Sequence, residues 1–157
     1  MRESSYNSSI AGEIEEEIGG RVIKLSDRAT LGLPDSLHIL DEIVSFIEVK
    51  IGDKFYSVDG KIEVEPWRSI NDLRQYELCR SISKHATVVY MIYYPEIKMT
   101  AVLPMKILEY FNPRLGTSAS KRLHEGTEFV VGHGLDALKK ILSERRDYLR
   151  GKLNSQS

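Results

Sequence analysis

The chain has 157 residues, 41% of them hydrophobic and 29% charged, which excludes a disordered chain and is typical of one globular domain. One cysteine, Cys79, excludes an internal disulfide and any cysteine-ligated zinc cluster. No apolar segment approaches the roughly 18 residues of a transmembrane helix, and the N-terminus lacks the apolar core of a signal peptide, so an intracellular protein is expected.

Charge is distributed unevenly along the chain, although the net charge is only −1. Residues 1–105 hold 12 basic and 17 acidic side chains, whereas residues 106–157 hold 10 basic and 6 acidic ones. A neutral average with one basic region is typical of a protein that meets a polyanion on one side. Glutamine occurs only twice while Glu, Lys and Arg are plentiful, which favours a heat-loving source.

The N-terminal part predicts a loose polar tail followed by an acidic amphipathic helix. The tail is expected over residues 1–9, and a similar one over residues 153–157. Isoleucines at four-residue spacing predict a helix over residues 10–18, which Gly19-Gly20 ends. A short strand is expected over residues 21–25.

A second helix is predicted to begin at Pro34, with Asp35 as its N-cap. Its buried stripe would consist of four apolar side chains at helical spacing, Leu37, Leu40, Ile43 and Val44. After it, period-two patterns and turn dipeptides such as Asp59-Gly60 predict an antiparallel meander. The meander would have strands over residues 46–51, 54–58 and 61–65.

The longest β-branched and aromatic run of the chain spans residues 84–94, and it predicts the central strand of a sheet. A helix capped by Ser69 is expected before it, and an antiparallel partner strand after it, over residues 97–103. Three further elements are predicted: a short helix over 105–111, a strand over 127–131 and a long helix over 135–152. The fold class is therefore α+β, a mostly antiparallel mixed sheet with helices packed on it.

One candidate site consists of Pro34-Asp35, a spacer of twelve residues, and Glu48-Val49-Lys50. This pattern resembles the metal-dependent nucleases whose signature is Pro-Asp, a spacer, and (Asp or Glu)-x-Lys. The resemblance implies that Asp35 and Glu48 hold a divalent cation, expected to be Mg²⁺, and that Lys50 stabilises the attacking water or the phosphate. Period two places Glu48 and Lys50 on one face of a strand. Two observations leave an alternative open: Asp35 begins a predicted helix instead of a strand, and Glu48 and Lys50 could line a solvated surface.

A second candidate site is the polar entrance of the central strand, where His85 could act as a general base and Lys84 could contact phosphate. The alternative is a surface Lys-His pair that ends a helix with favourable charge.

A third group of candidate residues is basic, and it is predicted to bind the phosphate backbone of duplex DNA without contacting the bases. The loop over residues 114–122 combines small hydroxyl residues with cations, and the last helix adds further cations. The predicted DNA-binding residues are Arg114, Lys121, Arg122, Lys139, Lys140, Arg145, Arg146 and Arg150. The alternative is an ordinary solvated helix surface. No Walker loop, dinucleotide fingerprint, nucleophile elbow or zinc spacing of the four histidines occurs.

In its length, composition and residues 84–94, the chain resembles the small nucleases of filamentous archaeal viruses (lipothrixviruses). That resemblance implies hydrolysis of linear double-stranded DNA, a topology remotely similar to nucleotidyltransferases, and a viral protein in the host cytoplasm. It also implies a catalytic glutamate at position 86, where this chain has Ala86. The hypothesis is that the chain is an inactivated variant, and that Asp35, Glu48 and Lys50 become the better candidates if Ala86 is native.

The leading prediction is a metal-assisted deoxyribonuclease that acts on double-stranded DNA, and the sequence also allows a homodimer. The alternative from another class is a non-enzymatic DNA-binding or replication accessory protein that uses the same basic region.

Overall fold

The structure is a computed structural model that describes residues 3–25, 33–52, 61–64, 69–104, 121–124 and 129–154. Every structural statement below concerns these residues. Their helices and strands are, in chain order, α1 (Glu3–Glu17), β1 (Arg21–Lys24), β2 (Ser36–Leu40), β3 (Ile43–Ile51), β4 (Lys61–Val64), α2 (Ser69–Ile82), β5 (Thr87–Tyr94), β6 (Met99–Pro104), β7 (Lys121–His124), β8 (Val130–His133) and α3 (Asp136–Asn154).

Six strands form one mixed sheet in the order β1-β2-β3-β5-β6-β8. The pair β3–β5 is parallel, and the other four neighbouring pairs are antiparallel. The parallel pair is joined by a crossover that contains α2, as a parallel connection requires. The predicted α+β class with a mostly antiparallel mixed sheet is confirmed.

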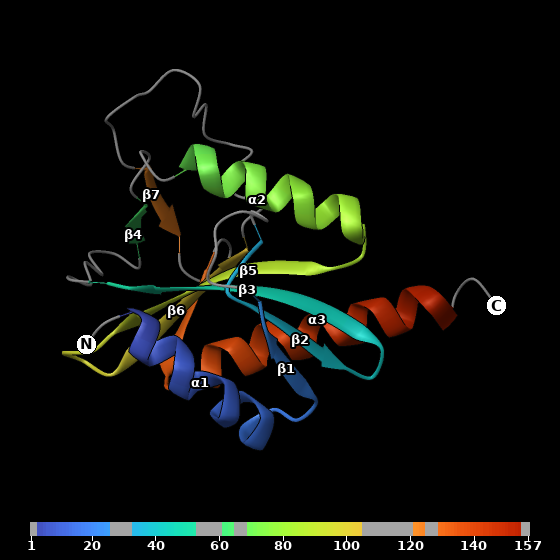
Figure 1. Cartoon of the computed structure of the whole chain (residues 1–157), viewed down its shortest axis with the longest axis horizontal. Helices are drawn as coiled ribbons and strands as arrows, with labels where there is room; N and C mark the ends of the chain where they lie inside the picture. Colours follow the sequence, from blue (N-terminus) through green and yellow to red (C-terminus); the bar gives the residue numbers. More distant parts are fainter. Residues whose placement is uncertain are drawn as a thin grey trace.

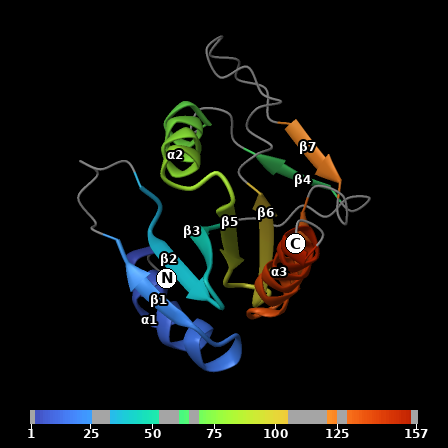
Figure 2. The same ribbon diagram turned by 90° about the vertical axis from the view of Figure 1, so that its right-hand side faces the viewer.

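Helices cover both faces of this sheet (Figure 1). Helix α2 packs on one face, where Tyr76 and Cys79 meet Phe46 and Val88. Helices α1 and α3 pack on the other face; Ile14 and Leu138 belong to its cluster with Ile47, Val49 and Met91. The same layers are visible in Figure 2, where β4 and β7 form a separate two-stranded sheet beside the larger one. Each face of the sheet therefore has its own apolar core, and side chains of β3 alternate between them.

Strand β5 lies in the middle of the sheet between β3 and β6, which confirms the prediction from its composition. Val89 and Met91 are fully buried on the α1–α3 face, and Val88 and Tyr90 are buried on the α2 face. A run without polar interruption is what a strand covered on both faces needs.

The helix predicted after Pro34 is wrong, because residues 36–51 form the β2–β3 hairpin. Leu40 pairs with Ile43, so the turn consists of Asp41 and Glu42 alone, and both have positive φ angles, 52° and 67°. The spacing of Leu37, Leu40, Ile43 and Val44 fits a helix, but it fits this hairpin equally well. Residues 36–40 form a strand because they pair with β1 on one side and β3 on the other. The spacing of apolar residues within the segment cannot predict this pairing.

Two further predictions need correction. Helix α1 begins at Glu3, so it includes residues that were assigned to a loose tail; Tyr6 anchors this extension by stacking on Tyr93, with 4.4 Å between ring centroids. The expected meander is also wrong, because β3 already pairs with β2 on one side and β5 on the other, and β4 pairs with β7, far along the chain. Local turn signals cannot report such long-range pairing.

The structure confirms the strand β1, the helix α2, the partner strand β6 and the long helix α3 within a few residues of their predicted ends. The strand predicted over 127–131 corresponds to β8. The strand predicted over 54–58 and the helix predicted over 105–111 lie outside the described residues. Among the described helices, none is long and apolar enough to cross a membrane.

Candidate active site

The β2–β3 hairpin places the two acidic residues of the nuclease-like pattern next to each other. Ser36 pairs with Ile47, so the same register brings Asp35, one residue earlier, beside Glu48. Asp35 is held at both of its ends: its Oδ2 accepts a hydrogen bond from the Val49 N–H at 2.8 Å, and its carbonyl accepts one from the Leu25 N–H at 2.9 Å. Asp35 thus precedes a strand and does not cap a helix.

The Glu48 carboxyl hydrogen-bonds to Asp35 beneath α2, and its pKa is raised from 4.5 to about 9. Burial is the largest cause, because it disfavours the charged form; the hydrogen bond to Asp35 and the charge of Asp35 add to it. Lys50 and a hydrogen bond from Gln75 oppose this shift. Two carboxylates this close repel each other unless a proton or a cation lies between them.

Lys50 completes the predicted set on the same face of β3. Its Nζ lies 5.6 Å from the ring centroid of Tyr90, the residue of β5 that pairs with Glu48. The ammonium is therefore directed along the face that carries Glu48, where it lowers the pKa of Glu48. The structure brings together Asp35, Glu48 and Lys50.

Helix α2 supplies two neighbours of Glu48 that sequence reasoning did not assign to the site. Gln75 hydrogen-bonds to Glu48, and the charge of Glu48 contributes to raising the pKa of the Cys79 thiol to about 12, after burial itself. The two residues are four apart on one helix face. Cys79 is fully buried. The signal for Gln75 was its place on the sheet-facing side of α2, one turn before Cys79.

The chemistry of these side chains fits a divalent cation. Among the described residues no cluster of three or more His, Cys, Asp or Glu side chains exists, so the donors are the two carboxylates of Asp35 and Glu48. Mg²⁺ is commonly held by one or two carboxylates while it keeps several waters. A cation would also remove the repulsion that now raises the pKa of Glu48.

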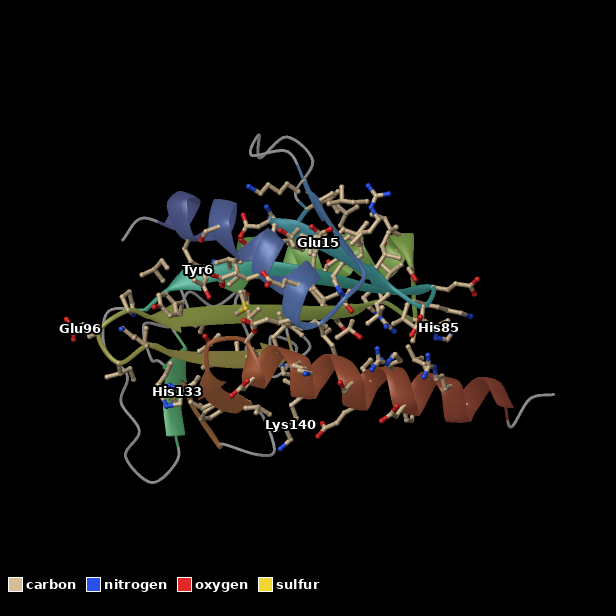
Figure 3. All side chains as sticks on the ribbon, turned by 90° about the horizontal axis from the view of Figure 1, so that it is seen from below. Tyr6, Glu15, His85, Glu96, His133 and Lys140 are labelled. Carbon is tan, nitrogen blue, oxygen red and sulfur yellow. The ribbon has the colours of Figure 1, made fainter. Side chains whose placement is uncertain are left out.

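The other candidate site lies elsewhere on the sheet. Lys84 and His85 are exposed in the α2–β5 connection, where the Lys84 carbonyl accepts a hydrogen bond from Arg80. Ala86 is buried in the apolar cluster of the α2 face with Phe46 and Val88. The strand residue beside Glu48 is Tyr90, four residues beyond Ala86, which at about 3.3 Å per residue is roughly 13 Å away. Figure 3 shows His85 at one end of the sheet and Glu96, just beyond β5, at the other.

The cations of α3 lie on the opposite face of the sheet from Glu48, since α3 packs with Ile47 and Val49. Lys139 and Lys140 are exposed, and Figure 3 shows Lys140 on the side of α3 that is farther from α1. The guanidinium of Arg145 stacks at 5.2 Å from the Tyr148 ring centroid. The cations of α3 and the carboxylates are thus on different faces of the sheet.

Two of the predicted DNA-binding arginines already have a partner. Arg150 hydrogen-bonds to Asp41 of the hairpin turn at 2.8 Å, and Arg146 lies 3.9 Å from the same carboxylate. Lys121 and Arg122 belong to β7, so this part of the predicted loop is a strand, and Arg114 lies outside the described residues.

A small pocket lies between the hairpin and α3, and it is separate from the carboxylates. Its lining includes His38, whose Nε2 is 2.9 Å from the Gly19 carbonyl oxygen, together with Ser45 and Arg146. Ser45 and Ile47 share a face of β3, whereas Glu48 points to the other face. The pocket contains no carboxylate and plays no part in the candidate site.

Comparison with known proteins finds similarity in structure and none in sequence. No protein-family model and no curated protein sequence matches the chain. The Holliday junction resolvase of the archaeal hyperthermophile Archaeoglobus fulgidus superposes with a TM-score of 0.51 at 13% identity, over 79% of this chain and 88% of the resolvase. A bacterial homing endonuclease superposes with a TM-score of 0.42 at 17% identity, over 82% of this chain and 80% of that chain. The similarity to the resolvase establishes a shared fold.

Proposed function

We propose that the chain is a nuclease that hydrolyses phosphodiester bonds of double-stranded DNA with a divalent cation held by Asp35 and Glu48. The observation that carries the proposal is the hydrogen-bonded pair of these carboxylates beside Lys50, on one face of β3. The nuclease-like pattern requires this proximity, because the two acids would hold the same cation. The fold shared with a Holliday junction resolvase favours the same reaction class.

Each side chain has a defined role in this proposal. A bound Mg²⁺ supplies a water of lowered pKa and neutralises charge on the phosphate. Asp35 and Glu48 bind the cation, and the backbone N–H of Val49 holds Asp35 in place. Lys50 places its ammonium against a phosphate oxygen, where it stabilises negative charge as the fifth bond to phosphorus forms. The nearby burial of apolar side chains limits the access of competing water.

The test is cleavage of DNA by the wild-type chain and by Asp35→Asn, Glu48→Gln and Lys50→Ala. Asparagine is preferred at position 35 because its Oδ1 can still accept the hydrogen bond from Val49, so the variant loses charge but keeps the local structure. Linear duplex, a closed circle and a four-way junction, each with Mg²⁺, separate cuts at ends, internal cuts and cuts at branches.

We expect each substitution to lower the cleavage rate by about 100-fold or more, whereas Glu96→Gln, on an exposed turn, keeps wild-type activity. DNA that stays intact with the wild-type chain, but is bound in a salt-dependent manner, would favour the non-enzymatic DNA-binding protein instead. The exposed cations of α3, which lie away from the carboxylates, are the observation behind that alternative.

The viral nuclease hypothesis makes a different proposal about position 86. If a glutamate there is required, Ala86→Glu raises cleavage of linear duplex DNA, even when Glu48 is replaced by glutamine. If Asp35 and Glu48 form the site, Ala86→Glu adds a charge to a buried apolar cluster and brings no activity. The burial of Ala86 beside Val88 leads us to favour the second result.

A further inference from the structure

Gln75 has a side-chain oxygen that the fold leaves without a partner. Its Oε1 is buried and accepts no hydrogen bond from any described residue. A buried amide oxygen without a donor costs free energy, and an apolar side chain of similar size would avoid that cost. The same side chain hydrogen-bonds to Glu48, so the oxygen without a partner lies next to the proposed cation site.

The orientation of the Gln75 side-chain amide follows from its hydrogen bonds. Because Oε1 has no hydrogen-bond partner, the hydrogen bond between Gln75 and Glu48 is donated by Nε2 and accepted by the carboxylate. Oε1 therefore points away from the Glu48 carboxylate and remains available as an acceptor.

We propose that Gln75 is a positioning residue of the cation site: its Nε2 orients Glu48, and its Oε1 accepts a hydrogen bond from a water bound to the cation. This inference rests on the proposed function and adds α2 to it. Waters on a bound divalent cation are strong donors, and a buried acceptor at the edge of the site gives one of them a fixed direction. In this proposal, Oε1 of Gln75 gains a hydrogen-bond donor only when the cation and its waters bind.

The proposal predicts opposite effects of one substitution. Gln75→Leu removes the buried oxygen without a partner, so the cation-free protein should melt at the same temperature as wild type or higher. The same change should weaken binding of Mn²⁺ alone, measured by titration calorimetry, by about tenfold, because loss of a partner behind the ligands typically costs 10–100-fold in affinity. A purely structural glutamine would lower the melting temperature.

A charge-adding pair of variants provides the matched control. Gln75→Glu brings a third carboxylate to the site and should bind Mn²⁺ more tightly than wild type. Leu78→Glu adds the same charge to the exposed side of the same helix, and should change Mn²⁺ binding much less. Equal tightening by both variants would reduce the effect to long-range charge and overturn the proposal.

The Glu48→Gln variant separates the two levels of inference. If wild type binds Mn²⁺ no better than Glu48→Gln, the proposed function and the role of Gln75 fail together. If Glu48→Gln loses binding while Gln75→Leu keeps wild-type affinity, only the role of Gln75 is overturned. Loss of binding in both variants, with a stable Gln75→Leu protein, supports both inferences.

Discussion

In the unfolded chain the Glu48 carboxyl has its ordinary pKa of 4.5, whereas burial and the neighbouring Asp35 raise this pKa to about 9 in the folded protein. Between these values the folded state binds more protons than the unfolded state, so the free energy of unfolding falls as pH rises through this window. The acidic pair therefore makes the cation-free protein less stable at neutral and alkaline pH. The residues that are proposed to hold the cation therefore lower the free energy of unfolding of the cation-free protein.

Glu48→Gln should remove this penalty, because its side chain stays neutral at every pH. We expect the variant to be more stable than wild type by at least about 1 kcal/mol near pH 8, with the difference shrinking as pH falls toward about 4.5. Urea unfolding in the presence of a chelator, at both ends of this window, measures it. A difference that does not change with pH would contradict the raised pKa of Glu48.

At the scale of elements, the β2–β3 hairpin and the residue that precedes it, Asp35, position all three residues of the nuclease-like pattern. Its two-residue turn has positive φ at Asp41 and at Glu42, a conformation that glycine and asparagine adopt far more easily. Asp41 also binds Arg150, so its side chain has a second role that Glu42 lacks in the described contacts. The turn is therefore strained at a position where one residue can be changed alone.

Glu42→Gly should relieve the strain and raise the free energy of unfolding by about 1 kcal/mol. Thermal unfolding of the full chain measures it. Glu77→Gly is the matched control: Glu77 is exposed in the middle of α2, where glycine should lower stability by about 1 kcal/mol. A loss of stability in both variants would mean that the turn is not strained.

The elements with strong local signals could be predicted from sequence, and those that depend on distant pairing could not. The cap at Ser69, the β-branched run of β5 and the periodicity of α3 each identify their element without reference to the rest of the chain. For β2, the apolar spacing satisfied two structures, and its neighbours β1 and β3 decided between them. For β4, the partner β7 begins 57 residues beyond the end of β4.

The candidate site follows the same rule. Residue type and spacing were enough to propose Asp35, Glu48 and Lys50, because the nuclease-like pattern is defined in the sequence alone. Gln75 could not be proposed in this way, since its contact with Glu48 depends on how the α2 crossover sits over β3. The entrance of β5 attracted attention through its titratable residues, Lys84 and His85, yet register places it well away from the carboxylates.

For the whole molecule, the two faces of the sheet divide the proposed tasks. The carboxylates lie under α2, and the exposed lysines lie on α3 across the sheet. If α3 contacts DNA, its contribution should be to affinity and its salt dependence, and cleavage chemistry should be unaffected.

Replacement of Lys139 and Lys140 by glutamine should weaken duplex binding and lower the slope of log affinity against log salt by about 2, while the cleavage rate at saturating DNA stays unchanged. A salt titration of binding, followed by cleavage at saturation, measures both quantities. Lys98→Gln, on the exposed β5–β6 turn, is the control. An unaltered slope would leave the α3 lysines as an ordinary solvated surface.

The tight hairpin also constrains how the spacer between Asp35 and Glu48 can vary among related sequences. The two acids face each other across paired strands that are joined by a two-residue turn. Lengthening this hairpin at its tip adds one residue to each strand, so the spacer grows by two at a time. A single added residue would turn Glu48 and Lys50 to the face of Ile47 and Val49, unless a bulge or a longer turn absorbs it. A search for relatives should therefore allow spacers of even length first, and expect odd lengths to come with a glycine in the turn.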